Sequence, residues 1–484
     1  MANNTESRTL FAEHLWVPRG FVHNARVDVA GGTIAEVSRD AACGDAEIVG
    51  RWVIPGMPNV HSHAFQRAMA GLTERRPGTV ATGEDREALI PDRTLQVDNF
   101  WTWREVMYAF AGRIDPDALH AIAAQLYVEM LKAGYTRVCE FHYLHQQPDG
   151  SPYADPAAMS LALIEAAEET GIGLTLLPTL YMTGGFDGRA LSERQRRFGL
   201  DLDGYLRLVE QLRAVRSPGL RIGVAFHSLR AVPEDAMRML LECETAHGSP
   251  IHIHIAEQIG EVQDCLAIRN ARPVEWLLDH MPVDRRWCVV HATHLTDEET
   301  RRLAATGAVV GLCPTTEANL GDGIFPLKAW RDANGAIGIG SDSHVSVSPV
   351  EELRWLEYGQ RLNLRHRNIA ADPGASVGAT LWSAAFDGGA RACGIPTGVF
   401  AVNGGHDSVP ARADLLVLDD ESPLLAANAA ASVLDCLVFA GNTPLVKHVM
   451  VEGTWRVRNA HHEDEERIAM RYRKTIEALT AQGN

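Results

Sequence analysis

The stretch WVIPGMPNVHSH, residues 52–63, is an apolar run that ends in two histidines, and it is the first of several such runs. The others are YTRVCEFHYL (135–144), GLTLLPTLY (173–181), LRIGVAFH (220–227), PIHIHIAE (250–257), RWCVVHA (286–292), GAVVGLC (307–313) and GAIGIGSD (335–342). Amphipathic segments such as PDALHAIAAQLYVEMLKAG (116–134) and PEDAMRMLLECETAHG (233–248) lie between them and favour helices. Short strands that are apolar throughout are typical of a parallel sheet covered by helices. This alternation predicts an α/β fold, a (β/α)8 TIM-type barrel.

Both ends of the chain are rich in short strand-like segments separated by turns. These segments are FVHNARVDVAGGTIAEVSR (21–39), ARADLLVLDD (411–420) and VKHVMVEGTWRVR (446–458). We therefore predict that residues 1–52 and 396–484 pair into a small β-rich domain, a β-sandwich, and that residues 53–395 form the barrel. The polar stretch Arg75–Asp98 lacks periodicity and predicts a long loop after the first barrel strand, the kind of loop that forms a lid or is disordered.

Composition and charge exclude several classes of protein. With 484 residues, 46% of them hydrophobic, the chain can bury a large core and is typical of a soluble globular protein. Its formal net charge of −17 argues against binding to nucleic acid or to anionic membranes, because those partners are polyanions. The N-terminus lacks the pattern of a secretory signal, and the most apolar long stretch, Leu424–Val446, is interrupted by polar residues, so we expect no membrane span. The eight cysteines form no C-x-x-C pair, so we expect free thiols and a cytoplasmic protein.

Histidines and an aspartate stand where the strand-like runs end. His61 and His63 are two residues apart, so both side chains point to the same side of a strand and can bind one metal ion. His254, His291 and Asp342 come at the ends of later runs, and the carboxyl ends of barrel strands meet in one place. Histidine and aspartate suit Zn²⁺, which leaves a position for a water molecule whose pKa it lowers to about 7. The pattern predicts a metal-dependent hydrolase.

Each of these residues also has a simpler structural interpretation. An H-x-H pair alone is weak evidence, and one of His252 and His254 is expected to be a core histidine. Asp342 can cap the following helix, and Glu257 can stand in a first helical turn, where the helix dipole favours it. His291 alone is more often structural than catalytic. The cysteines of the barrel runs, Cys139, Cys288 and Cys313, are interpreted as small buried apolar side chains.

Longer motifs surround these residues. They are GMPNVHSHAFQRAMAGL (56–72), FWTWREVMY (100–108), EMLKAGYTRVCEFHYLH (129–145), FHSLRAV (226–232), HIHIAEQIGEV (252–262), RWCVVHATH (286–294), GLCPTTEANLGDGIFP (311–326) and GIGSDSHVSVSPVEELRWLEYGQRL (338–362). In these motifs the chain resembles the amidohydrolase superfamily, and within it the formimidoylglutamate deiminase family of histidine degradation. The resemblance extends over nearly the whole barrel, and the motifs are long and specific.

The resemblance implies a set of site residues. A single Zn²⁺ ion would be held by His61, His63, His254 and Asp342, and no lysine stands out as a bridge to a second metal ion. Catalysis would use Glu257 for proton transfer, together with His291 and Asp342. The residues implied in substrate binding are Gln66, Arg104, Tyr143, His227 and Arg230. The resemblance also implies a small-molecule substrate and a homodimer.

The implied reaction is hydrolytic deimination of N-formimino-L-glutamate to N-formyl-L-glutamate and ammonia. Two arginines suit the two carboxylates of this substrate, because the guanidinium fork matches a carboxylate, although each could instead form a surface salt bridge. The long Arg75–Asp98 stretch, and the run Leu180–Thr183 where a histidine-containing loop is expected, depart from the family pattern. The alternatives are a related deaminase of a heterocycle such as a pterin or nucleobase, and an inactive barrel that serves as a scaffold.

Overall fold

The computed structural model describes residues 7–17, 20–74, 100–244, 247–395, 411–426 and 429–481. The predicted Arg75–Asp98 loop lies outside the described residues.

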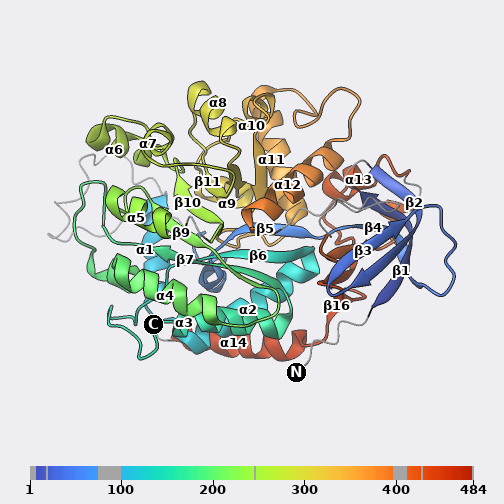
Figure 1. Cartoon of the computed structure of the whole chain (residues 1–484), viewed down its shortest axis with the longest axis horizontal. Coiled ribbons are helices and arrows are strands. Elements are labelled where there is room, and N and C mark those ends of the chain that lie inside the picture. Colours follow the sequence, from blue (N-terminus) through green and yellow to red (C-terminus); the bar gives the residue numbers. More distant parts are fainter. Residues whose placement is uncertain are drawn as a thin grey trace.

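A closed parallel barrel forms the centre of the protein (Figure 1). Its strands, in the order in which they pair around the ring, are β5 (Met57–Ser62), β6 (Tyr135–His142), β7 (Gly173–Leu180), β9 (Val224–Ser228), β10 (Ile251–Ile255), β11 (Trp287–His291), β12 (Val309–Leu312) and β13 (Ala336–Ile339). The short β8 (Leu220–Ile222) adds a further parallel pairing with β7. The ring closes where β13 pairs with β5, so each predicted apolar run contributes a barrel strand and the predicted fold class is confirmed.

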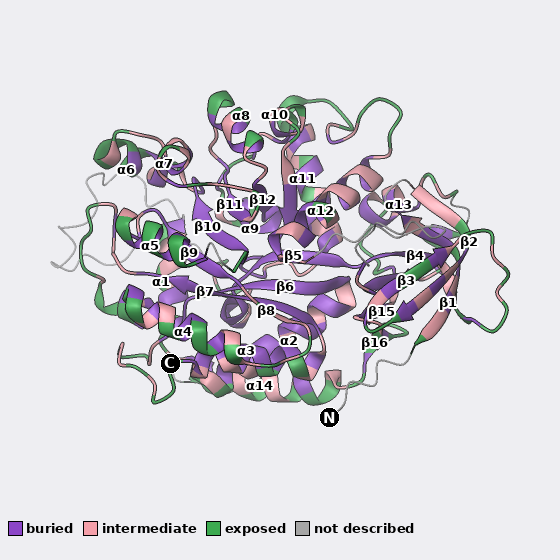
Figure 2. Cartoon of the chain, viewed as in Figure 1, coloured by how far each residue is buried: buried purple, intermediate pink, exposed green. Residues whose placement is uncertain are grey.

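Helices surround the barrel and leave its strands almost completely buried (Figures 1 and 2). They are α1 (Phe100–Ala111), α2 (Pro116–Ala133), α3 (Ala158–Thr170), α4 (Leu202–Ala214), α5 (Glu234–Glu244), α6 (Ile259–Arg269), α7 (Pro273–His280), α8 (Asp297–Ala305), α9 (Pro314–Leu320), α10 (Leu327–Asp332), α11 (Pro349–Leu364) and α12 (Val377–Ala392). Local signals set their ends. In α2, for example, the Asp115 side chain accepts a hydrogen bond from Ala118 N at 2.8 Å, and Gly134 ends the helix with a left-handed φ of 107°.

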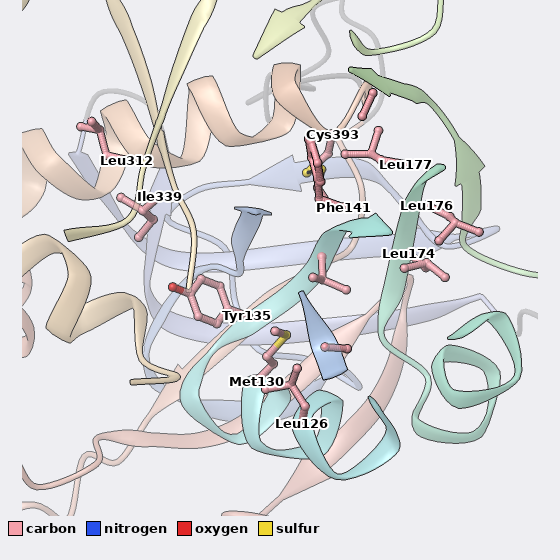
Figure 3. Close-up of a cluster of buried hydrophobic side chains, with 14 of the residues drawn as sticks. Leu126, Met130, Tyr135, Phe141, Leu174, Leu176, Leu177, Leu312, Ile339 and Cys393 are labelled. Carbon is pink, nitrogen blue, oxygen red and sulfur yellow. Dashed lines mark hydrogen bonds between the residues drawn. The ribbon is translucent and has the colours of Figure 1, made fainter. Parts of the chain in front are cut away.

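Apolar side chains fill the space between the strands and the helices. Figure 3 shows one such cluster, in which Leu126 and Met130 of α2 lie near Tyr135 of β6. Burial of this apolar surface is the main contribution to the stability of the barrel. Among the described helices, none combines the length and the apolar character needed to cross a membrane.

The two ends of the chain form a second, mostly antiparallel sheet. Its strands, in order, are β17 (His461–His462), β16 (Thr454–Arg458), β15 (Val446–Val451), β14 (Leu415–Leu418), β4 (Glu47–Pro55), β1 (Arg8–Val17), β2 (Gly20–Ala30) and β3 (Thr33–Ser38). The sheet curls until β3 meets the residues before β14, where Ile34 N donates to Ala411 O at 2.8 Å. This closure encloses a separate apolar core that includes Leu10, Val27 and Leu415.

The chain passes from one sheet to the other at Gly56. β4 ends at Pro55 in the terminal sheet and β5 begins at Met57 in the barrel, so the run 52–63 is divided between two strands. A Cβ atom at Gly56 would lie 2.2 Å from the Thr136 side chain, and glycine is therefore required at this crossing.

Helical segments of the C-terminal region lie against the barrel. They are η3 (Pro423–Leu425), α13 (Val433–Phe439) and α14 (Glu465–Ala481). Lys132 Nζ of α2 is 2.6 Å from Glu465 Oε2, and Arg113 donates to Leu479 O at 3.1 Å. Part of the predicted 396–484 segment is thus helical and packs on the barrel.

Candidate active site

Three histidines converge at the carboxyl end of the barrel. His61 belongs to β5, His63 follows that strand, and His254 belongs to β10. The Nε2 atom of His61 lies 3.1 Å from that of His63 and 2.9 Å from that of His254. Because β5 and β10 lie on opposite sides of the ring, closure of the barrel brings the three nitrogens together.

Hydrogen bonds orient two of these rings. His63 Nδ1 lies 2.9 Å from Phe141 O, and His254 Nδ1 lies 2.9 Å from His227 O. A carbonyl oxygen can only accept, so both Nδ1 atoms carry the proton and both Nε2 atoms present a lone pair. Burial also lowers the pKa of His63 and His254 and keeps the rings neutral. Lone pairs this close repel one another unless a cation lies between them, so the donor set fits a metal ion such as Zn²⁺.

Asp342 approaches the same centre from the end of β13. Its Oδ1 atom is 3.4 Å from Nε2 of both His61 and His63. Backbone hydrogen bonds from Asp342 N to His61 O (3.0 Å) and from His63 N to Asp342 O (3.2 Å) attach it to β5. Asp342 has a φ of 46° and His291 a φ of 69°, conformations that are uncommon for residues other than glycine.

Glu257 and His291 lie beside this cluster. His291 Nε2 is 4.0 Å from Glu257 Oε1 and 3.9 Å from Asp342 Oδ2. Burial raises the pKa of Glu257 to about 7, against the lowering effect of His291. Burial disfavours charge on His291, but Glu257, a hydrogen bond to Glu317 and Asp342 together raise its pKa to about 10. A carboxyl group with a pKa near 7 can both gain and lose a proton at neutral pH, so Glu257 beside His291 is suited to proton transfer.

Glu317 is a site residue that the sequence reasoning missed. Its Oε1 atom lies 3.3 Å from His291 Nδ1 and accepts a hydrogen bond from Cys313 N at 2.9 Å. The only signal was its place in the motif 311–326, which indicates nothing about its partner.

His252, by contrast, is a core histidine. Its Nε2 atom lies 2.8 Å from Ala392 O, and burial lowers its pKa to about 4. The ambiguity between His252 and His254 is resolved by the side of β10 on which each lies, because only His254 faces the other two imidazoles.

The predicted substrate-binding residues all line one pocket above the histidines. It contains Gln66, Arg104, Tyr143, His227 and Arg230, together with His63, His254, Glu257, His291 and Asp342. Its remaining lining residues were not predicted and are mostly aromatic or apolar. They are Phe100, Trp103, Met107, Tyr108, Tyr181, Phe198, Thr316 and Leu320.

Contacts within the pocket hold its polar groups in place. Gln66 Nε2 donates to Tyr143 OH at 3.2 Å. The Arg104 guanidinium lies over the Tyr108 ring, 5.2 Å from its centroid. Arg230 is 3.9 Å from Glu261 Oε2 and is only slightly exposed. Two cations in a buried, partly aromatic pocket favour an anionic ligand.

The cysteines of the barrel are free thiols in the structure. Cys139, Cys288 and Cys313 are completely buried, and Cys139 Sγ lies 3.2 Å from Cys393 Sγ. Cys313 also lies near His291 and Glu317, in a group whose potential ligand atoms are all within 4.8 Å of one another. Burial among apolar side chains agrees with the interpretation of Cys139 and Cys288 as small core residues.

Comparison with known proteins agrees with this geometry. A model of the amidohydrolase family matches residues 52–456. The chain belongs to the amidohydrolase family. It is 49% identical over 474 residues to a formimidoylglutamate deiminase of Pseudomonas aeruginosa, an alignment that covers 97% of this chain and 99% of the relative. The crystal structure of an amidohydrolase from Brucella melitensis has a TM-score of 0.88 and 42% identity, covering 98% of this chain and all of that one.

More distant relatives act on other compounds. A 5-methylthioadenosine/S-adenosylhomocysteine deaminase of Natronomonas pharaonis is 26% identical over 417 residues, covering 86% of this chain and 84% of the relative. Family membership makes this amidohydrolase a hydrolase that acts on C–N bonds of a small molecule, and it argues against an inactive scaffold.

Proposed function

We propose that this amidohydrolase is a zinc-dependent deiminase that converts N-formimino-L-glutamate to N-formyl-L-glutamate and ammonia, a step of histidine degradation. One observation carries the proposal. The pocket lined by His63 and His254, which lie beside His61, is also lined by two arginines, Arg104 and Arg230. The named activity of the 49% identical relative supports the same substrate.

His61, His63, His254 and Asp342 would hold a single zinc ion. The ion would supply Lewis-acid chemistry and lower the pKa of a water molecule to about 7. The lone pairs of the three histidines and the carboxylate of Asp342 match the ligand preferences of zinc.

The protein groups would move the protons. Asp342 accepts a proton from the attacking water, and His291, whose raised pKa keeps it protonated, orients the water oxygen toward the formimino carbon. Glu257, 4.0 Å from His291, transfers a proton to the departing nitrogen, so that ammonia leaves in place of an amide ion. The carbon gains an oxygen from water and loses its terminal nitrogen, which balances the reaction.

Arg104, Arg230, Tyr143, His227 and Gln66 would bind the rest of the substrate. The planar guanidinium groups suit the two carboxylates of glutamate, and burial strengthens such charge-assisted hydrogen bonds. A net charge of −17 over the whole chain does not prevent this, because the field inside the pocket comes from its own residues.

A second candidate is deamination of an aminated heterocycle, such as a pterin or nucleobase. The aromatic residues of the pocket, Trp103, Tyr108, Tyr181 and Phe198 among them, favour it because a flat ring can stack on them. A heterocycle provides no carboxylate for the two arginines that line the pocket, and this candidate therefore ranks second.

The test is ammonia release by the zinc-loaded protein from N-formimino-L-glutamate, N-formimino-L-aspartate and aminated heterocycles, compared side by side. We expect rapid release from the glutamate compound. Release from a heterocycle instead would favour the second candidate and refute the first. The Arg230→Met variant sharpens the test, since it should impair turnover of the diacid far more than turnover of an uncharged ring.

We further propose that the enzyme works as a homodimer in the cytoplasm. The exposed side chains of Trp355, Tyr358 and Leu362 follow one side of α11 and support a contact with a second copy. The free cysteines are consistent with a reducing compartment.

A further inference from the structure

Tyr181 places a phenol group in the wall of the pocket, next to the loop that carries Arg230. It follows β7 directly, and its side chain is 4% exposed. The next residues attach this segment to the Arg230 loop. Met182 N and Thr183 N donate to Ala231 O at 2.8 and 3.0 Å, and Thr183 Oγ1 donates to Arg230 O at 3.0 Å. These hydrogen bonds therefore fix the position of the Tyr181 loop relative to the Arg230 loop.

Neighbouring rings restrict the Tyr181 side chain. His227 meets it edge to face with the centroids 4.4 Å apart, and Phe198 lies 5.9 Å away on the same wall. A ring packed in this way cannot rotate freely, so the position of its hydroxyl oxygen is well defined. What the packing leaves open is the direction in which the hydroxyl donates.

Gln195 settles that direction. It lies in η2 (Glu193–Phe198), and its side chain accepts a hydrogen bond from Ser192 N at 3.0 Å. A backbone N–H can only donate, so the atom that faces Ser192 is the amide oxygen and the other end is the NH₂ group. Gln195 Nε2 lies 2.8 Å from Tyr181 OH, and an NH₂ group can only donate. The Tyr181 oxygen therefore accepts here, and its own proton remains for another acceptor.

We propose that Tyr181 donates this proton to the substrate carboxylate that Arg230 binds, and that Gln195 is the positioning residue that sets the donor direction. The inference deepens the proposed function and rests on it. A carboxylate offers an acceptor oxygen to each of the two donors. The corresponding amide would turn an NH₂ group toward one of them, so the pair selects a carboxylate over an amide.

The first experiment compares Tyr181→Phe with the wild type on N-formimino-L-glutamate. We expect KM to rise roughly tenfold with kcat nearly unchanged, because a hydrogen bond to a charged group away from the reacting carbon contributes to binding. The matched control is Tyr135→Phe, which removes the hydroxyl of a completely buried tyrosine at the start of β6 and should leave KM unchanged. An unaltered KM in Tyr181→Phe would overturn the proposal.

The second experiment reverses the hydrogen bond. In Gln195→Glu one carboxylate oxygen still accepts from Ser192 N, while the other attracts the Tyr181 proton away from the pocket. We expect KM to rise about as much as in Tyr181→Phe, with little further change when the two substitutions are combined. If Gln195→Glu raises KM equally with and without the Tyr181 hydroxyl, it acts through its charge, and the positioning role is wrong.

Binding of glutarate, a dicarboxylate without the formimino group, tests the contact independently of turnover. Calorimetry on the zinc-loaded protein should give a Kd roughly tenfold weaker for Tyr181→Phe than for the wild type. Equal affinities would refute the contact. Absence of ammonia release by the wild type from N-formimino-L-glutamate would refute the proposed function instead, so the two failures are distinguishable.

Two analogues then identify the carboxylate. N-formimino-γ-aminobutyrate and N-formimino-α-aminobutyrate each lack one of the two carboxylates of the substrate. The effect of Tyr181→Phe on KM should vanish for the analogue that lacks the carboxylate bound by Tyr181 and persist for the other. An effect of equal size on both analogues would show that the hydroxyl contacts neither carboxylate.

Discussion

The junction between the two sheets and the carboxyl end of the barrel both bury charged side chains, but they arrange them differently. At the junction, Arg412 donates to Asp414 at 2.9 Å and to Glu452, and Asp414 Oδ1 accepts from Glu452 N at 2.7 Å. Burial alone would lower the pKa of Arg412, but the two carboxylates raise it above its usual range. Opposite charges meet there, and the folded protein needs no ligand to satisfy them.

At the carboxyl end of the barrel, like groups meet instead. The Nε2 atoms of His61, His63 and His254 face one another, and Glu257 lies near Asp342. The backbone of Asp342 is left-handed, a conformation that costs free energy. The chemistry of these groups fits the binding of a cation. The comparison teaches that buried charged groups stabilise the fold where they pair with an opposite charge of the protein. Where like groups are buried together, they are suited to binding an ion or a ligand.

The largest effect is expected where the cation would be bound. Asp342→Asn should lower kcat by at least about a thousandfold, because it removes both a metal ligand and a proton acceptor. The melting temperature of the metal-free protein should stay the same or rise, since the substitution removes the repulsion between the Asp342 and Glu257 carboxylates. Ammonia release and calorimetric melting measure the two quantities. Activity near that of the wild type would contradict the assigned site.

The two histidines of β10 give a matched pair for metal binding. His254→Asn should lose most of the bound zinc, measured by atomic absorption, and with it the activity. His252→Asn should keep the zinc and lose only about 1–2 kcal/mol of the free energy of unfolding, because it disturbs one buried hydrogen bond to Ala392 O. Zinc loss in both variants would contradict the assignment of His254 to metal binding and of His252 to the core.

Glu257→Gln tests proton transfer without removing a proposed ligand. The amide cannot give a proton to the departing nitrogen, so kcat should fall by about a hundredfold to ten-thousandfold. Zinc content should be unchanged, which separates this variant from His254→Asn. A wild-type kcat in Glu257→Gln would assign the transfer to another group.

The smallest effect on activity is expected at the junction. Arg412→Met should lower the free energy of unfolding by about 3 kcal/mol, because it leaves Asp414 without its cation and leaves Glu452 with Arg137 alone, 3.8 Å away. Values of kcat and KM should be nearly unchanged. Arg458→Met is the control, since Arg458 forms an exposed pair with Glu47 at 3.0 Å that contributes less than about 1 kcal/mol. Equal losses of stability in Arg412→Met and Arg458→Met would contradict the claim that the buried charges of the junction stabilise the fold.

Much of the fold and part of the site could be predicted from the sequence. The apolar runs have the length and composition of strands buried on both faces, and that property is local. The pair His61 and His63, and the positions of His291 and Asp342 at strand ends, follow from the two-residue period and from the rule that barrel strands end together. Family motifs added Arg104 and Arg230, which strand periodicity alone does not distinguish from surface cations.

Other features depended on which parts of the chain become neighbours. Glu317 joins His291, Gln195 directs Tyr181, and Arg412 meets Glu452 only after segments distant in sequence have packed together. The division of the run 52–63 at Gly56 and the left-handed backbone of Asp342 are likewise imposed by packing. The sequence by itself determined the alternation of strands and helices and the kinds of side chain at the strand ends, because both are set by short-range periodicity. Only the tertiary structure decided which side chains face each other, because those contacts arise when the ring of strands closes.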